Sequence, residues 1–202
     1  HKPSMTVNIK TGLFNCHACD AKGDFIDFYC RKTGLSFSDA VNDLGKQAGI
    51  QKQKPKIIKE YNYLDVDGNL VCQTVRFEPK DFRQRHKKNG QWVWNLKGVN
   101  TVLYNLPAIS KANQVLVLEG EKDCDTAVSL GYDATTSPMG AGKWKESYSR
   151  TLYGKEVILI PDCDKPGIEH MLSIGRQLKD KATVKWFEYP IRTTSKFDFT
   201  DF

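Results

Sequence analysis

Three acidic side chains follow two short apolar runs in the second half of the sequence. Glu119 comes directly after Val115–Leu118, and Asp162 and Asp164 come shortly after Val157–Ile160. Continuous apolar runs of this length are typical of parallel strands covered on both faces. Because the carboxyl ends of neighbouring parallel strands open onto one crevice, we expect the three carboxylates to converge there. Such a cluster suits Mg²⁺ or Mn²⁺, and it predicts metal-assisted phosphoryl transfer.

A single acid after a strand has a simpler explanation, because it is more often a helix cap or a turn residue. The prediction of a metal site therefore depends on all three acids together. The segments around them support it. A helical stretch extends from Gly120 to Leu130, another follows Asp164, and Val184–Tyr189 supplies a third strand. This alternation predicts an α/β fold, a parallel sheet with helices on both sides.

The first half of the sequence predicts smaller elements. Short strands and turns extend to about residue 23, followed by one helix carrying Phe25 to Tyr29. A second helix begins after Ser36, its predicted N-cap, and its apolar spacing predicts that Val41, Leu44 and Ala48 are buried. The polar, basic, proline-containing segment 51–60 indicates a linker. Beyond it, alternation around Asp67-Gly68 predicts an antiparallel hairpin over Tyr61–Phe77.

Two cysteines sit close enough in the sequence to share a metal ion. Cys16 and Cys19 form a Cys-x-x-Cys pair, whose thiolates can reach one tetrahedral Zn²⁺ at about 2.3 Å. Zinc needs four ligands, and nearby candidates are limited to His1, His17 and Cys30. A redox dithiol or two idle thiols are the alternatives. The other cysteines are scattered singly and no apolar run approaches the ~18 residues of a membrane span, so we expect a cytoplasmic protein without membrane contact.

Positive charge is concentrated between Arg76 and Lys97. This stretch holds seven Lys/Arg against two acids, a local +5 in a chain of net charge +6. Such a patch is expected where a protein meets phosphates, and a solvated loop is the alternative. Phe82, Trp92 and Trp94 offer stacking faces for unpaired bases. The two tryptophans, two positions apart, share a face of any strand, and core packing is the alternative for them.

The cysteine pair lies within a longer match to a known family. Lys2–Val41, with Phe14-Asn-Cys-His-Ala-Cys at its centre, resembles the second half of the CHC2 zinc-binding domain of DnaG-type primases. In that family an upstream Cys-Pro-x-His supplies the other two zinc ligands. His1 is a poor match for that histidine by its spacing, so we expect the missing pair to lie upstream of this sequence. The resemblance implies Cys16 and Cys19 as zinc ligands.

The acidic motifs resemble the two signatures of the Toprim domain, which topoisomerases, small nucleases and DnaG-type primases share. The motifs are Val115–Asp123 and Ile158–Gly167, and Lys196–Asp201 resembles a further acidic motif of primases. The resemblance implies Glu119, Asp162 and Asp164 as catalytic acids. It implies five ligands for the divalent cation: Glu119, Asp123, Asp162, Asp164 and Asp198.

The segment before the Toprim motifs resembles the amino-terminal subdomain of phage, plasmid and mobile-element primases. Arg76–Arg85 and Trp92–Tyr104 carry this resemblance, which implies a basic ridge that guides template and nucleotide. The residues assigned to nucleic acid or nucleotide are Arg76, Lys80, Arg83, Arg85, Lys97 and Lys122. The expected organisation is a partial CHC2-like module (1–50), the linker (51–60), a small mixed α+β basic subdomain (61–113) and a Toprim catalytic domain (114–202).

These resemblances imply a DNA primase of the replication machinery, which synthesises short RNA primers by metal-dependent nucleotidyl transfer. Its expected partners are a single-stranded DNA template and ribonucleoside triphosphates, with a replicative helicase, fused or separate, as a further candidate. Its expected cofactors are Mg²⁺ or Mn²⁺, and Zn²⁺. Two alternatives stay open: another Toprim enzyme such as a nuclease, and a non-catalytic nucleic-acid-binding module of a replication protein.

Overall fold

The chain consists of two units, His1–Lys54 and Pro55–Phe202, in a computed structural model that describes residues 4–50, 54–138, 140, 142–189 and 199–201. Residues 51–53, the start of the predicted linker, lie outside the described residues. Strand β4 (Lys56–Leu64) already begins inside the segment predicted as a linker. Residues 56–60 therefore belong to a sheet and not to a linker, because they pair with the far end of the next strand.

The first unit has three short antiparallel strands and two helices. Its elements are β1 (Met5–Val7), β2 (Phe14–Cys16), β3 (Lys22–Gly23), α1 (Phe25–Thr33) and α2 (Phe37–Gln47), with the strands in the order β1-β2-β3. Both helices have side-chain caps. Asp24 forms a capping box with Asp27, and the Ser36 hydroxyl accepts the Asp39 N–H at 3.2 Å, which confirms the predicted N-cap.

The core of this unit is small. Among its described residues only Phe14 and Ala40 are buried apolar side chains. The prediction that Val41 and Ala48 are buried was wrong, since both are exposed, and Leu44 is half-buried. The physical reason is that α2 packs mainly on α1, where the Tyr29 hydroxyl donates to Asp43 at 2.6 Å. Val41 and Ala48 instead line an open cavity.

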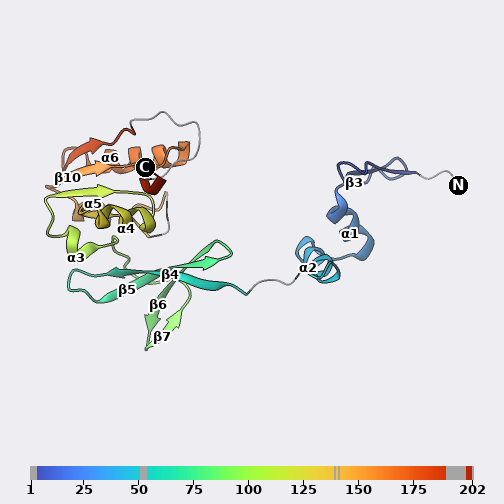
Figure 1. The fold of residues 1–202 in the computed structure, drawn as a ribbon, viewed down its shortest axis with the longest axis horizontal. Coiled ribbons are helices and arrows are strands. Elements are labelled where there is room, and N and C mark those ends of the chain that lie inside the picture. The colour runs from blue at the N-terminus through green and yellow to red at the C-terminus, as the bar shows by residue number, and fades with distance from the viewer. Residues whose placement is uncertain (1–3, 51–53, 139, 141, 190–198, 202) are drawn as a thin grey trace. The chain divides into compact units, whose positions relative to one another are not determined.

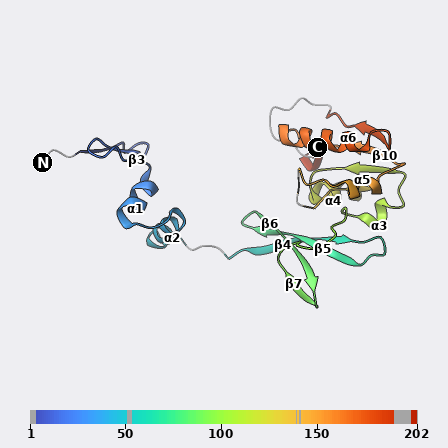
Figure 2. The same cartoon turned by 180° about the vertical axis from the view of Figure 1, so that it is seen from behind.

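The second unit begins with an antiparallel sheet in the order β4-β5-β6-β7 (Figures 1 and 2). Strands β5 (Leu70–Glu78), β6 (Asp81–Lys88) and β7 (Gln91–Val93) follow β4. The predicted hairpin is confirmed, and Asp65 fixes its turn by accepting the N–H groups of Asp67 and Asn69. Strands β6 and β7 were not predicted, because lysine and arginine obscure the apolar alternation there.

A parallel sheet follows, as predicted, and its four strands have the order β11-β10-β8-β9, with β9 not predicted from the sequence. Its strands are β8 (Gln114–Val117), β9 (Ala134–Thr135), β10 (Glu156–Leu159) and β11 (Thr183–Trp186). The accompanying helices are α3 (Leu106–Ile109), α4 (Glu121–Ser129), α5 (Glu146–Thr151) and α6 (Lys165–Leu178), and the short 3₁₀ helix η1 spans Phe199–Asp201. None of the described helices is long and apolar enough to cross a membrane.

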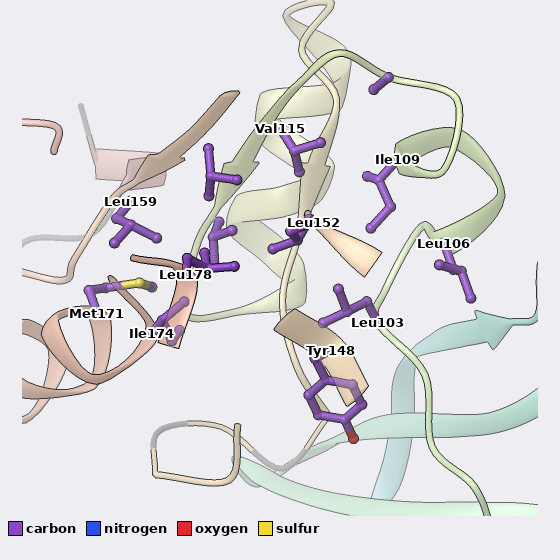
Figure 3. Packing of buried hydrophobic residues seen from close by; sticks show 13 residues of the cluster. Leu103, Leu106, Ile109, Val115, Tyr148, Leu152, Leu159, Met171, Ile174 and Leu178 are labelled. Carbon is purple, nitrogen blue, oxygen red and sulfur yellow. The ribbon is translucent and has the colours of Figure 1, made fainter. Parts of the chain in front are cut away.

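Strands β8 and β10 are covered on both faces, which explains their continuous apolar runs, whereas the edge strand β11 is exposed. Val115 and Leu159 belong to one core with side chains from α3, α5 and α6 (Figure 3). Leu116 and Leu118 belong to a second core with α4 and the β4–β5 hairpin, whose Tyr63 is fully buried. Helices therefore lie on both sides as expected, and the hairpin completes the cover on the α4 side.

Candidate metal and nucleic-acid site

The acids of the two Toprim-like motifs lie at the ends of neighbouring strands. Strands β8 and β10 pair in parallel with Val117 opposite Leu159, so Glu119 and Asp162 both follow the same edge of the sheet. The Glu119 Oε1 atom accepts a hydrogen bond from the Asp162 N–H at 3.3 Å. Asp164 caps α6, accepting the Gly167 N–H at 2.9 Å. The structure thus brings the two acidic loops together.

Gly167 is required for this approach. A Cβ atom built at Gly167 would lie 2.0 Å from Glu119 Oε1 and 3.0 Å from the Asp162 carbonyl oxygen. Any side chain at this position would displace the Glu119 carboxylate. The glycine in the first turn of α6 therefore makes room for the acid that follows β8.

Negative charge is concentrated around Glu119. Burial raises the pKa of Glu119, the hydrogen bond from Asp162 opposes this, and the charges of Asp164 and Asp123 raise the pKa further. Oxygen donors crowded in this way have the chemistry that Mg²⁺ and Mn²⁺ prefer. In the described part of the chain, no three His, Cys, Asp or Glu side chains surround a common point closely enough to hold a metal. Asp198, another predicted ligand, lies outside the described residues.

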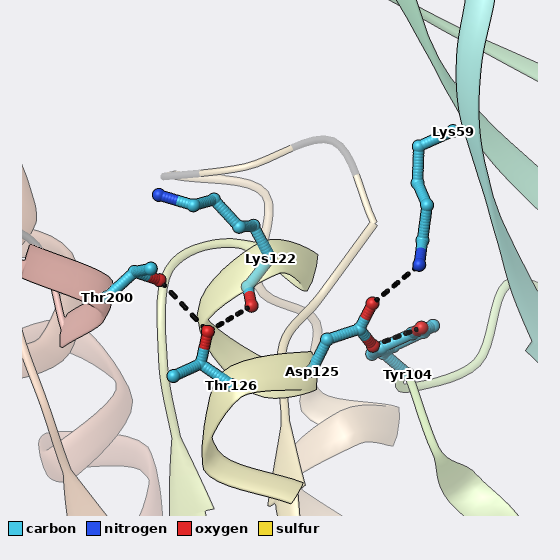
Figure 4. A network of polar contacts seen from close by, with 6 residues as sticks. All are labelled: Lys59, Tyr104, Lys122, Asp125, Thr126 and Thr200. Atoms are coloured by element: carbon cyan, nitrogen blue, oxygen red, sulfur yellow. Dashed lines mark hydrogen bonds and ion pairs between the residues drawn. The ribbon is translucent and has the colours of Figure 1, made fainter. Parts of the chain in front are cut away.

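Asp123 is buried on α4 and connects this helix to the end of the chain. Its Oδ1 atom accepts the Thr200 N–H at 3.1 Å and also the Thr200 hydroxyl. The hydroxyl oxygens of Thr126 and Thr200 lie 3.2 Å apart (Figure 4). These contacts fix the Asp123 carboxylate beside η1, and nothing in the sequence pointed to Thr200.

Two further acids of α4, one turn apart, hold the antiparallel sheet. Glu121 accepts the Tyr63 hydroxyl at 2.8 Å. Asp125 accepts the Tyr104 hydroxyl at 2.8 Å and pairs with Lys59 at 3.3 Å (Figure 4). Burial raises the pKa of both tyrosines, so both hydroxyls stay protonated donors. These contacts were not predicted, although the spacing of acids on α4 was a signal for them.

Part of the predicted basic surface lies in one cavity. Lys59, Arg76 and Lys122 line a cavity of about 470 Å³ between the β4–β5 hairpin and α4, together with Asp125 and Thr126. The structure therefore brings Arg76 and Lys122, which are 46 positions apart in the sequence, to one place. Three cationic side chains around one hollow suit a phosphate group.

The other predicted basic residues lie elsewhere. Lys80 is exposed in the turn between β5 and β6, and Lys97 is exposed in the loop after β7. Arg83 is exposed on β6, where it pairs with Asp81 at 2.8 Å and lies over the Phe77 ring at 4.8 Å. These side chains remain accessible to a nucleic-acid backbone.

Arg85 has a different role from the predicted one. Only 7% of it is exposed, and it donates to Gln73 at 2.7 Å and to Glu60 at 2.6 Å. Its guanidinium lies over the rings of Trp92 and Trp94, at 4.0 and 5.0 Å. The two tryptophans thus face the same cation. Because this cation is surrounded by protein groups, we exclude Arg85 from the proposed nucleic-acid surface.

The cysteine pair lies in the first unit. Cys19 is exposed and Cys16 is half-buried. Hydrogen bonds from the Ala18 backbone and the Ser4 hydroxyl, followed by those from Cys19, lower the pKa of Cys16 to about 7. A thiol with this pKa is deprotonated easily, as zinc binding requires. Two thiols of this kind have the chemistry of half a tetrahedral zinc site.

We predict that, with zinc removed by EDTA, Cys16 is alkylated readily at pH 7, where about half of it is thiolate, whereas Cys72 and Cys124 react slowly. Burial shields both of these thiols and raises the pKa of Cys72 to about 11. Peptide mass spectrometry after a short iodoacetamide pulse measures all three rates. Equal rates at Cys16 and Cys72 would contradict the prediction.

Comparison with known proteins finds relatives of the first unit. Residues 1–60 match the family model described as CHC2 zinc finger, Zn_ribbon_DnaG. The DNA primase of Deinococcus radiodurans is 41% identical over 49 residues, which are 24% of this chain and 9% of that protein. The DNA primase of Streptomyces coelicolor is 44% identical over 48 residues, 24% of this chain and 8% of that protein. The chain thus spans less than a tenth of these curated relatives.

Solved structures extend the likeness of the fold to the second unit. The primase fragment of the bacteriophage T7 primase-helicase has a TM-score of 0.50 and 19% identity, over 94% of this chain and 85% of that one. The Escherichia coli primase catalytic core has a TM-score of 0.52 and 15% identity, over 84% of this chain and 57% of that one. A DnaG primase catalytic domain bound to ssDNA has a TM-score of 0.51 and 15% identity, over 85% of this chain and 66% of that one. The chain therefore joins a segment similar to the CHC2 zinc finger to a unit whose fold is similar to that of primase catalytic cores.

Proposed function

We propose that this chain synthesises RNA primers on single-stranded DNA, the reaction of a DNA primase. One observation carries the proposal: Glu119, after β8, accepts a hydrogen bond from Asp162, after β10, at the carboxyl edge of the parallel sheet. The same edge holds Asp164, and the fold is that of primase catalytic cores. Its substrates would be a DNA template and ribonucleoside triphosphates.

Divalent ions, Mg²⁺ or Mn²⁺, would be held by Glu119, Asp162 and Asp164, with Asp123 and Asp198 as further candidates. When bound, such ions activate the attacking 3′-hydroxyl and neutralise the leaving pyrophosphate. The protein itself supplies the position of the acids. Gly167 admits the Glu119 carboxylate, and the Asp162 N–H orients it.

The basic groups would hold the phosphates of substrate and template. Lys59, Arg76 and Lys122 surround a hollow beside the same helix that carries Asp123, so a bound phosphate would lie close to the acidic edge. Arg83 and the exposed ring of Phe82 on β6 would contact the template backbone and its bases. The related DnaG catalytic domain bound to ssDNA supports this choice of partner.

The first unit would assist at the start of synthesis. Cys16 and Cys19 would bind Zn²⁺ together with two ligands outside the described residues, and the zinc module would select the initiation site on the template. A replicative helicase, fused or separate, is a further proposed partner.

Primer synthesis is tested directly by incubating the protein with single-stranded DNA, Mg²⁺ or Mn²⁺ and labelled ribonucleoside triphosphates. Oligoribonucleotide products that disappear in Asp162→Asn are expected. The exposed Asp133 provides the control, and Asp133→Asn should retain activity. Shortened DNA without RNA products would favour a nuclease. Binding of DNA without either product would favour a non-catalytic module.

We predict that Arg76→Ala and Lys122→Ala each weaken the binding of single-stranded DNA or of nucleotide. Each should also reduce the salt dependence of the binding constant. Removing one cation that neutralises a phosphate should lower the slope of log K against log salt by about 0.7. Fluorescence anisotropy between about 50 and 200 mM salt measures this slope. Lys111→Ala, an exposed lysine outside the cavity, serves as the matched control. Unchanged slopes in both variants would exclude the cavity as a phosphate site.

A further inference from the structure

A second cavity, of about 350 Å³, lies beside the first turns of α6. Its lining residues are Gly142, Trp144, Pro166, Glu169, His170 and Ser173. Pro166 precedes Gly167, the residue against which the Glu119 carboxylate rests. Asp164, the cap of the same helix, is two residues earlier. The cavity therefore adjoins the acidic edge of the sheet, and neither the metal site nor the basic cavity accounts for it.

His170 lines this cavity and carries one donor whose position on the ring is defined. Only 7% of the residue is exposed, and its Nδ1 atom accepts the Gly142 N–H at 3.1 Å. Burial lowers the pKa of His170, so the ring is neutral at pH 7. With Nδ1 acting as an acceptor, the proton of the neutral ring is on Nε2. Within the part of the chain that the structure describes, Nε2 has no hydrogen-bond partner.

Trp144 supplies an aromatic wall. Its Nε1–H already donates to the Ser149 hydroxyl at 2.9 Å. Its ring packs edge-on against Tyr148, with centroids 5.7 Å apart, and lies 6.5 Å from the His170 ring. These contacts hold the indole ring in place. Because its N–H is already used, the ring can contact a ligand only through its apolar surface. A fixed aromatic wall and a histidine with one unused donor, both lining the cavity, suit a planar heterocycle that carries an acceptor atom.

We propose that this cavity binds the base of a ribonucleotide whose phosphates lie at the acidic edge, with the His170 Nε2–H donating to a ring nitrogen or carbonyl oxygen of the base. The proposal rests on the proposed function and identifies how the same site recognises its nucleotide. A volume of about 350 Å³ is within the range of small-ligand pockets and exceeds what a single base needs. Pro166 lines the cavity and the next residue, Gly167, contacts Glu119, so a base in the cavity would lie beside the acids that would hold its phosphates.

The test uses His170→Asn, because the asparagine Oδ1 atom can replace Nδ1 as the acceptor for Gly142 while the Nε2 donor is removed. Calorimetric titration in Mg²⁺ compares ATP, GTP, CTP and UTP with inorganic tripolyphosphate, which has no base. We expect His170→Asn to bind at least one nucleotide about tenfold more weakly, with tripolyphosphate affinity and melting temperature unchanged. His170→Gln, whose amide can donate from near the Nε2 position, should recover part of the nucleotide affinity.

Two results would overturn the proposal: unchanged affinity for all four nucleotides, or equal losses for nucleotides and tripolyphosphate, which would indicate a purely structural histidine. The same experiments distinguish a failure of this proposal from a failure of the proposed function. If the wild-type chain makes no RNA while His170→Asn still loses nucleotide affinity selectively, the base pocket stands and primer synthesis does not. If RNA is made and His170→Asn binds every nucleotide like the wild type, only the base pocket falls.

Discussion

Glu119→Gln is expected to lower primer synthesis by at least about 10³-fold while making the protein more stable. The loss follows because a neutral amide cannot provide the charge that a divalent cation needs. The gain follows because the Glu119 carboxylate is partly buried beside the negative charges of Asp164 and Asp123. Glutamine keeps an oxygen that can accept the Asp162 N–H, so the substitution removes charge and retains the hydrogen bond. We therefore expect Glu119→Gln to melt at a higher temperature than the wild type.

The pH dependence of this stability difference has a definite sign. Because the pKa of Glu119 is raised in the folded state, the folded protein holds this proton more tightly than the unfolded chain. Ionised Glu119 therefore lowers stability progressively as pH rises through the unfolded value of about 4.3 towards the folded one. The difference between Glu119→Gln and wild type should be largest at neutral pH and vanish below about pH 4. Thermal melts in EDTA measure it, and a less stable Glu119→Gln at pH 7 would contradict this prediction.

The approach of Glu119 to Asp162 was predictable because strand ends fix where their following residues lie. Two apolar runs identified β8 and β10, and their parallel pairing brings Glu119 and Asp162 to one edge whatever the rest of the chain does. No comparable rule links Arg76 to Lys122. Their proximity depends on how the β4–β5 hairpin packs on α4, which involves the tyrosine contacts to Glu121 and Asp125. The sequence shows these residue types but not which of them meet.

Arg85 shows why charge counting failed for one residue of the basic segment. The segment has a large excess of positive charge, yet strand alternation turns successive side chains to opposite faces. Arg83 and Arg85 share one face of β6, and Arg83 stays exposed because it lies nearer the β5–β6 turn. Burial of Arg85 comes from Trp92 and Trp94, which arrive from β7 and the loop after it. A strand that was not predicted from the sequence therefore decides the role of this arginine.

Arg85→Ala is accordingly expected to destabilise the second unit strongly and to leave nucleic-acid binding intact below the melting temperature. The substitution removes the donors to Glu60 and Gln73 and empties the space beside two tryptophan rings. Losing one partner of a buried pair costs about 3–5 kcal/mol, and the 43% exposure of the Glu60 side chain reduces this to about 2–3 kcal/mol. For a unit of this size we expect Tm to fall by about 5–10 °C.

The matched control is Arg83→Ala, two residues earlier on the same strand. Its ion pair with Asp81 is half-exposed on both sides, so we expect a cost below about 1 kcal/mol together with weaker binding of single-stranded DNA. Arg85→Met should fall between wild type and Arg85→Ala in Tm, because it keeps an apolar chain against the tryptophan rings. If Arg85→Ala melted like the wild type and lost affinity for single-stranded DNA, the guanidinium would have to reach the nucleic acid. Its burial between Glu60 and the two tryptophans would then not describe the protein in solution.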